Sequence, residues 1–107
     1  MALAATPAFA ADIVIGVAAP LSGPQAAEGR ALVDSVRWAV ETINAAAPLD
    51  ADRLTVAVED DACEEETAAG AASRLVAVAP ALVVGHPCGA AARAAARSYA
   101  AARTLFI

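Results

Sequence analysis

Short runs of β-branched residues alternate along this chain with long alanine-rich stretches, and this alternation restricts the possible folds more than any other feature. The apolar runs with strand character lie at 13–17, 54–58, 81–85 and 104–107. Parallel strands that are buried on both faces have such nearly continuous apolar sequences. Because a helical stretch follows each of the first three runs, the pattern is that of βαβ units. It predicts an α/β fold with a Rossmann-like parallel sheet and helices on both faces.

The first two helices are defined by apolar spacing and by their breakers. The first is expected to end near Asn44 and to be stopped by Pro48. The second follows an acidic run at 64–66, where a first helical turn favours negative charge, and ends before Pro80. One face of the first helix is marked by apolar residues at intervals of three or four, namely Leu32, Val36, Ala39, Val40 and Ile43.

The third helix is expected over residues 90–101. Arg93 and Arg97 lie one turn apart on it and are assigned to its solvent face. The single tryptophan, Trp38, and the single tyrosine, Tyr99, fall within predicted helices, and both are interpreted as packing residues.

Right-handed crossovers between these elements give four parallel strands in the order 2-1-3-4. Ligands of open α/β sheets bind beyond the carboxyl ends of the strands, where the strand order reverses, and here that point lies between the first and third strands. The loops 19–28 and 86–90 meet there. The second loop leads into a helix, so the amides of Gly89, Ala90 and Ala91 would be unpaired donors at the positive end of a helix dipole. They would stabilise a carboxylate, although many such helix starts bind only water.

Composition and charge exclude several partners. The chain has 107 residues, of which 34 are alanine, so its core is predicted to be thin. Its seven basic residues are all arginine and twelve residues are acidic, which gives a net charge of -5. No nucleic-acid partner is expected, because phosphate binding needs a positively charged face. Charged residues interrupt every apolar run before it reaches the roughly 20 residues that cross a bilayer, so a membrane-spanning segment is not expected.

Residues 1–11 resemble the end of a secretory signal peptide. The segment is small and apolar, and Ala8-Phe9-Ala10 has the form that signal peptidase accepts. It lacks a basic start and is short for a whole leader, so we interpret it as the remnant of one; an alanine-rich N-terminus is the alternative. Export would place the protein in an oxidising compartment, where disulfides persist.

The two cysteines fall in the loops after the second and third predicted strands, which lie on either side of the first strand in the predicted sheet. In an exported protein, Cys63 and Cys88 are expected to form a disulfide, which the long loop around Cys63 allows. The competing interpretation is a metal site that adds His86 and Asp60 or Asp61 to the two thiolates. Its spacing matches none of the familiar zinc patterns.

No enzyme motif is present. The chain has no G-x-S-x-G turn, no P-loop and no G-x-G-x-x-G after the first strand. Asp60 and Asp61 resemble the acidic pair of a receiver domain, but that pair follows the first strand and works with a lysine, which this chain lacks. We interpret the two aspartates as residues that cap the next helix and hold the loop. His86 is interpreted as a hydrogen-bonding scaffold residue, and neither an enzymatic activity nor a cofactor or metal is predicted.

Three segments resemble the N-terminal lobe of the leucine/isoleucine/valine-type periplasmic binding proteins, which are type I solute receptors of ABC transporters: DIVIGVAAPLSGPQAAEGRALVDSVRWAVETINA, VEDDAC and ALVVGHPC. The resemblance implies that residues 12–107 form an incomplete N-terminal ligand-binding lobe, which closes with a second lobe on a small ligand. It also implies a bridge between the two cysteines. It places the α-carboxylate of an amino acid at the loop and helix start after the third strand, that is, at Pro87, Cys88, Gly89 and Ala90.

Two departures from the family pattern bear on the ligand. Relatives usually have serine where this chain has Gly89, and many have an aromatic residue where it has Glu28. A carboxylate at Glu28 suits a cationic or hydroxylated ligand better than leucine, or is simply solvated.

The function that the resemblance implies is that of a periplasmic or otherwise exported substrate-binding component of an ABC transporter. Its ligand would be a branched-chain or related amino acid, or a similar small amphiphile, and its partner an inner-membrane ABC permease. An extracytoplasmic ligand-sensing domain of a receptor or regulator is the alternative. A small α/β enzyme is a third reading, against which the lack of an acid–base or nucleophile set argues.

Overall fold

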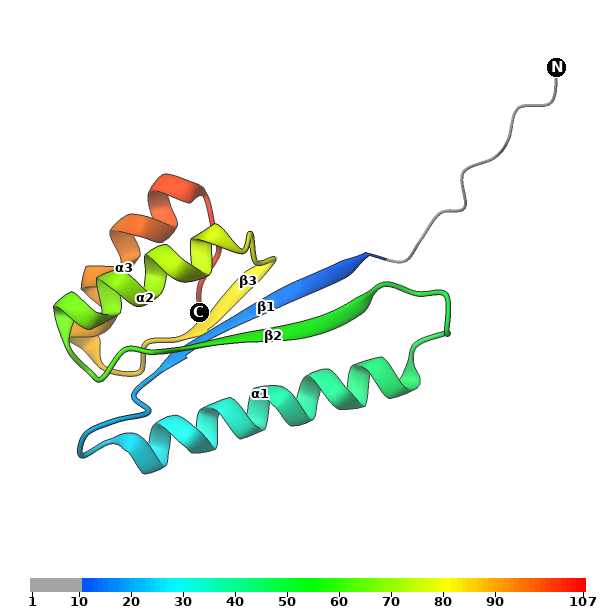
Figure 1. Ribbon diagram of the computed structural model, residues 1–107, viewed down its shortest axis with the longest axis horizontal. Coiled ribbons are helices and arrows are strands. Elements are labelled where there is room, and N and C mark those ends of the chain that lie inside the picture. The colour runs from blue at the N-terminus through cyan, green and yellow to red at the C-terminus, as the bar shows by residue number, and fades with distance from the viewer. Residues whose placement is uncertain (1–10) are drawn as a thin grey trace, which may run out of the picture.

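The computed structural model describes residues 11–107, in which strands and helices alternate as predicted. All but the last residue of the predicted leader remnant lie outside this range, so that interpretation stays a prediction. No helix in residues 11–107 combines the length and the apolar character that crossing a bilayer needs. The elements, shown in Figure 1, are β1 (Asp12–Ala19), α1 (Ala26–Ala46), β2 (Arg53–Asp60), α2 (Glu65–Ala77), β3 (Leu82–Gly85) and α3 (Gly89–Ala102).

The three strands form one parallel sheet in the order β2-β1-β3. β1 pairs with β2 along its whole length, from Asp12 opposite Arg53 to Ala19 opposite Asp60. It pairs with β3 over a shorter stretch, which begins with Ile15 opposite Leu82. The predicted reversal of strand order at β1 is therefore confirmed, and β1 is the central strand.

The predicted fourth strand is reduced to a single bridge. Phe106 pairs in parallel with Val83, on the outer side of β3, which is the predicted position. The predicted beginning of a fourth strand is therefore present but shorter than 104–107: the amide of Val83 donates to the carbonyl of Leu105, and the amide of Ile107 donates to the carbonyl of Val83, both at 2.9 Å. Thr104 is not part of it, because its amide donates to the carbonyl of Tyr99 at 2.8 Å and so belongs to the end of α3.

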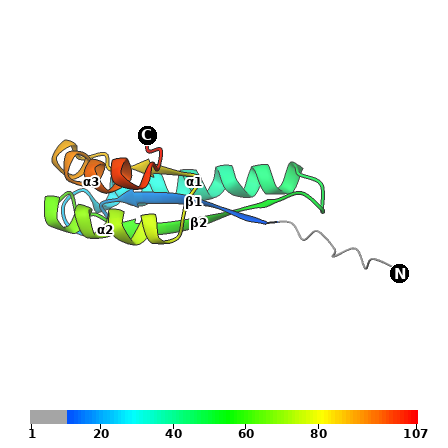
Figure 2. The ribbon, with the colours of Figure 1, turned by 90° about the horizontal axis from the view of Figure 1, so that it is seen from above.

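The helices cover the two faces of the sheet unequally, with α1 on one face and α2 and α3 together on the other (Figures 1 and 2). Successive residues of a strand point to opposite faces. Accordingly Val17 and Ala19 pack with Val33 of α1. Ala18, between them in the sequence, packs with Leu75 of α2 on the other side.

Alanine brings α2 and α3 into close contact. Five alanines of these two helices are completely buried, namely Ala68, Ala71, Ala72, Ala91 and Ala95.

Tyr99 is also buried, at 1% exposure, which confirms its packing role. Trp38 is 69% exposed, so the packing role predicted for it is wrong. It lies two positions from Val40, about 200° around the helix from the face that meets the sheet.

Ile43 departs in the same way from the apolar face predicted for the first helix. Its side chain is 54% exposed, whereas Val33 and Val40 are buried. The face that meets the sheet is thus narrower at the end of α1 than the spacing predicted.

A glycine allows α1 to approach the chain that leaves β1. A Cβ atom built on Gly29 would overlap the carbonyl oxygen of Pro20, whereas one built on Gly70 of α2 would meet only the Nη1 of Arg74, at 3.4 Å. Both glycines are helical, so their intrinsic preferences are alike and only their surroundings differ.

We predict opposite effects for the two matched substitutions. Gly29→Ala should lower the free energy of unfolding by about 2 kcal/mol or more, because α1 must move away from Pro20. Gly70→Ala should leave it unchanged or raise it by up to about 1 kcal/mol, because alanine is the better helix former. Urea unfolding of the full-length gene product, followed by helical circular dichroism, measures both. Equal effects would show that the contact at Gly29 does not constrain the helix.

Candidate functional site

The loops that follow the three strands gather at one end of the sheet. Because all strands run in parallel, their carboxyl ends and the N-termini of the helices lie along the same edge (Figure 1). The point where strand order reverses lies between β1 and β3, as predicted. The predicted site loops therefore belong to the edge at which ligands of open α/β sheets bind.

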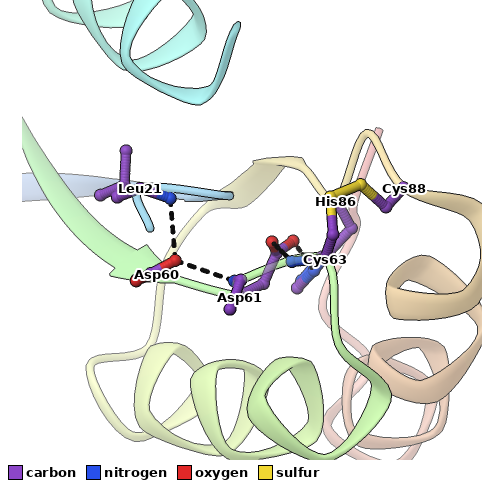
Figure 3. The surroundings of a disulfide bond; sticks show 7 residues. Leu21, Asp60, Asp61, Cys63, His86 and Cys88 are labelled. Carbon is purple, nitrogen blue, oxygen red and sulfur yellow. Dashed lines mark hydrogen bonds and ion pairs between the residues drawn. A yellow bond between two sulfur atoms is a disulfide. The ribbon is translucent and has the colours of Figure 1, made fainter. Parts of the chain in front are cut away.

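The disulfide predicted between Cys63 and Cys88 is present and joins two of these loops (Figure 3). The Cα atoms of the two cysteines are 5.4 Å apart. Since β1 lies between β2 and β3, the bridge connects loops from either side of the central strand. Both sulfur atoms are consumed by it, so the metal-site interpretation, which needs free thiolates, is wrong.

Asp60 ties the loop after β1 to the loop after β2. Its carboxylate accepts hydrogen bonds from the amide of Leu21 at 2.8 Å, the hydroxyl of Ser22 at 2.7 Å and the amide of Ala62 at 2.8 Å. Burial alone would raise the pKa of Asp60, but these hydrogen bonds together hold the pKa below its usual value of 3.8. Figure 3 shows the first of these contacts.

Asp61 turns the opposite way and is completely buried. It accepts a hydrogen bond from the amide of Cys63 at 3.0 Å and contacts Nδ1 of His86 at 3.0 Å. The predicted loop-holding role of the two aspartates is confirmed. Their predicted capping role is wrong, because the N-cap residue of α2 is Glu64 and no side chain caps that helix.

His86 links the two loops beneath the disulfide. Nδ1 of its buried ring contacts Asp61, and Nε2 lies 2.7 Å from the hydroxyl oxygen of Tyr99. Burial lowers the pKa of His86 below 6.5, although Asp61 acts in the opposite direction. A neutral ring fits both contacts, because it donates from Nδ1 to Asp61 and accepts at Nε2 from Tyr99. The predicted scaffold role of His86 is confirmed.

The backbone before the helix start adopts conformations that most residues avoid. Gly85 has a φ of 135°, and a Cβ there would overlap the carbonyl oxygen of Ala18. His86 follows with a φ of 54°, in the left-handed region, where residues other than glycine are uncommon. The glycine was visible in the sequence, but the left-handed histidine had no sequence signal.

The amides predicted to face a ligand lie at the start of α3. Cys88 is the N-cap residue, without a side-chain cap, and its carbonyl accepts the first bond of the helix from Ala92 at 2.9 Å. The amides of the three residues between them therefore precede the first bonded turn, as predicted. Their surroundings differ, since Gly89 is exposed, Ala90 is half-buried and Ala91 is completely buried. The exposed Pro87 and half-buried Cys88 complete the predicted set.

Arg93 is a charged residue near this site that no sequence motif indicated. It is exposed, as predicted, but its Nη1 lies 3.5 Å from the position of a Cβ atom at Gly89. The guanidinium thus adds positive charge beside the helix start. A surface pocket of about 290 Å³ adjoins it, lined by Glu65, Arg93, Ala94 and Arg97.

Glu28 lies in the first turn of α1, not in a loop as predicted, because the helix begins at Ala26. Its side chain is exposed, and α1 covers the opposite face of the sheet from α3 (Figure 1). An acidic residue in a first turn complements the helix dipole, which gives Glu28 a local role beside any contact with a ligand.

The parallel sheet, its helices on both faces and the tied loops at the strand ends define a Rossmann-like lobe of the type I binding-protein class. The sequence profile described as periplasmic binding protein matches residues 12–107. This chain belongs to the periplasmic binding protein family. Its homologues include Leu/Ile/Val-binding proteins, as the resemblance indicated.

Among its relatives, an amino acid binding protein of Pseudomonas aeruginosa is 42% identical over 79 residues, which cover 73% of this chain and 21% of the relative. Leu/Ile/Val-binding protein homolog 3 of Brucella melitensis is 40% identical over 89 residues, which cover 79% of this chain and 24% of the relative. The chain thus spans about a fifth to a quarter of the length of these relatives.

Solved structures of binding proteins also superpose on this chain. The branched-chain amino acid transporter substrate-binding protein LivJ of Streptococcus pneumoniae, in complex with isoleucine, superposes with a TM-score of 0.81 at 31% identity, over 89% of this chain and 28% of that one.

We predict that stability falls as the pH is lowered through 6.5, because His86 binds a proton more readily in the unfolded chain than in the fold. The stabilisation that neutral His86 provides is complete above pH 6.5. It is lost as the pH falls towards the lower pKa that His86 has in the folded protein. Asp60 acts in a separate window, below 3.8. Urea midpoints measured on both sides of pH 6.5 test this, with His86→Gln as the control that should show a smaller decrease. The same decrease in both proteins would contradict the role of His86.

Proposed function

We propose that this chain is part of the substrate-binding component of an ABC transporter, with a branched-chain or related amino acid, or a similar small amphiphile, as its ligand. The observation that carries the proposal is the family match over residues 12–107. The names of its relatives support it, since they include amino acid and Leu/Ile/Val-binding proteins. The same names do not favour the alternative of a sensory domain.

The geometry at the start of α3 supports an anionic group on the ligand. The amides of Gly89 and Ala90 precede the first bonded turn, and the helix dipole adds partial positive charge there. Arg93 adds a full charge close to Gly89. A carboxylate held there needs no lysine, and Pro87 and Cys88 would border it.

The rest of the ligand is less constrained by these residues. Gly89 lacks the hydroxyl group that the family resemblance implies at this position, so main-chain donors would carry more of the carboxylate binding. Glu28 belongs to the same edge of the sheet but to the other face, and it would favour a cationic or hydroxylated side chain on the ligand. Binding of this kind involves no bond chemistry.

The proposed location is the periplasm or another exported compartment. The family name and the disulfide both support an oxidising environment. An inner-membrane ABC permease is the proposed partner, to which the ligand would be delivered after the lobes close on it.

The experiment that tests this function is calorimetry of the full-length gene product with a small panel of ligands. Leucine, isoleucine, valine, threonine and arginine compare the side chains, and leucinamide removes the carboxylate. We expect at least one amino acid to bind and its amide to bind much more weakly. Equal binding of acid and amide would contradict the carboxylate site, and no binding by any amino acid would contradict the proposed ligand class.

We predict that Gly89→Pro weakens the binding of a carboxylate ligand by about 1 to 3 kcal/mol, because one amide donor is lost. Proline is well accepted at the first position of a helix, so α3 should remain intact. Gly89→Ala is the matched control, since it keeps the amide and its Cβ makes only an ordinary contact with Arg93. Calorimetry measures both, and equal affinity of the two variants would place the carboxylate elsewhere.

A further inference from the structure

The loops after β2 and β3 are connected by a second tie besides the disulfide. Asp61, His86 and Tyr99 form a continuous chain of side-chain hydrogen bonds, which we call the buried network. Asp61 is two residues before Cys63, and His86 is two residues before Cys88. The network therefore joins the same two loops as the bridge does, and Tyr99 extends the tie to α3.

The network is closed to solvent and internally satisfied. The exposed fractions are 0% for Asp61, 4% for His86 and 1% for Tyr99. Among the described residues, every buried side-chain nitrogen or oxygen has a hydrogen-bond partner. One arrangement of protons satisfies all three groups. The Tyr99 hydroxyl donates to Nε2 of His86, and Nδ1 of His86 donates to Asp61. This arrangement fixes the ring as one neutral tautomer.

The same histidine carries the strained backbone of the ligand loop, residues 85–89. Its φ of 54° is a conformation that persists only when the surroundings enforce it. Two side-chain bonds to the ring and one main-chain bond, from the His86 amide to the Ala18 carbonyl at 2.8 Å, supply that enforcement. Since Gly89 follows only three residues later, the direction of its amide depends on how His86 is held.

A catalytic role for these three residues does not fit the geometry. The group at the end of the network is the hydroxyl of Tyr99. Tyr99 is buried, and its ring packs against the ring of Phe106 with centroids 4.8 Å apart. Burial, followed by the charge of Asp61, raises the pKa of Tyr99 to about 12. The hydroxyl is thus out of reach of a ligand and stays protonated at neutral pH.

We propose that Asp61, His86 and Tyr99 are positioning residues, which hold His86 in its left-handed conformation and so aim the amides of Gly89 and Ala90. The bridge fixes how far apart the two loops are, and the network fixes the rotation of the ligand loop about that bridge. The consequence for ligand binding rests on the proposed function; the consequence for the loop does not.

The first experiment needs no ligand. His86 is the one histidine in residues 1–107. Selective 15N-histidine labelling of the full-length gene product therefore gives a single histidine signal from this part of the chain. We expect its ring to carry a proton on Nδ1 and none on Nε2 at neutral pH. Tyr99→Phe should weaken that tautomer preference and shift the backbone amide signals of residues 86–90. Phe106→Leu is the control, because it removes a ring that neighbours both His86 and Tyr99 but makes no hydrogen bond to either.

The second experiment measures binding of leucine, or of the amino acid found to bind best, by calorimetry. Tyr99→Phe should weaken it by about three- to tenfold, which corresponds to the loss of one buried hydrogen bond. Phe106→Leu should change it by less than about twofold. With both cysteines replaced by alanine, the effect of Tyr99→Phe should grow. Within residues 11–107 the network is then the remaining side-chain tie between the loops after β2 and β3. A double-mutant cycle measures that coupling.

The outcomes separate the two proposals. If Tyr99→Phe shifts the signals of residues 86–90 no more than the control does, the positioning role is overturned. If the signals shift but the affinity does not change, the positioning of the loop stands, and the carboxylate site assigned to Gly89 and Ala90 is overturned instead. Additive effects of Tyr99→Phe and bridge removal would contradict the claim that both ties hold the same loop.

Discussion

The connection across the end of the central strand is the constraint on which the site depends. β1 lies between β2 and β3, so the loops that follow those two strands leave the sheet on opposite sides of it. The Cys63–Cys88 bridge and the Asp61–His86 contact join these two loops side by side (Figure 3). Together with the main-chain bond from the His86 amide to the Ala18 carbonyl, this connection holds the chain as it enters α3.

The alanine-rich composition explains why such covalent and polar ties matter in this fold. Alanine lets α2 and α3 approach closely, but each buried alanine removes little apolar surface from water. A disulfide across 25 residues contributes about 3.5 kcal/mol on the chain-entropy model. The buried network adds specificity rather than bulk, since each of its groups has only one arrangement that satisfies all the others.

The site joins two kinds of charge that serve different purposes. The carboxylates of Asp60 and Asp61 accept hydrogen bonds from main-chain amides of the loops, and these bonds hold the loops in place. Positive potential at the edge comes from main-chain amides and from Arg93, which remain available. An acidic protein can in this way offer local positive potential at the edge where the carboxylate site is proposed.

The sequence alone determined the order of the elements, the strand order around β1 and the cysteine pair, because periodicity, the handedness of crossovers and loop position are local or topological properties. It did not reveal that two adjacent aspartates face opposite ways, that Trp38 is exposed, or that Arg93 reaches back towards Gly89. Only the tertiary structure decided those features and the buried network. Asp61 and His86 are 25 residues apart and His86 and Tyr99 are 13 apart, so their contact depends on backbone conformations in separate loops and helices that no local pattern encodes.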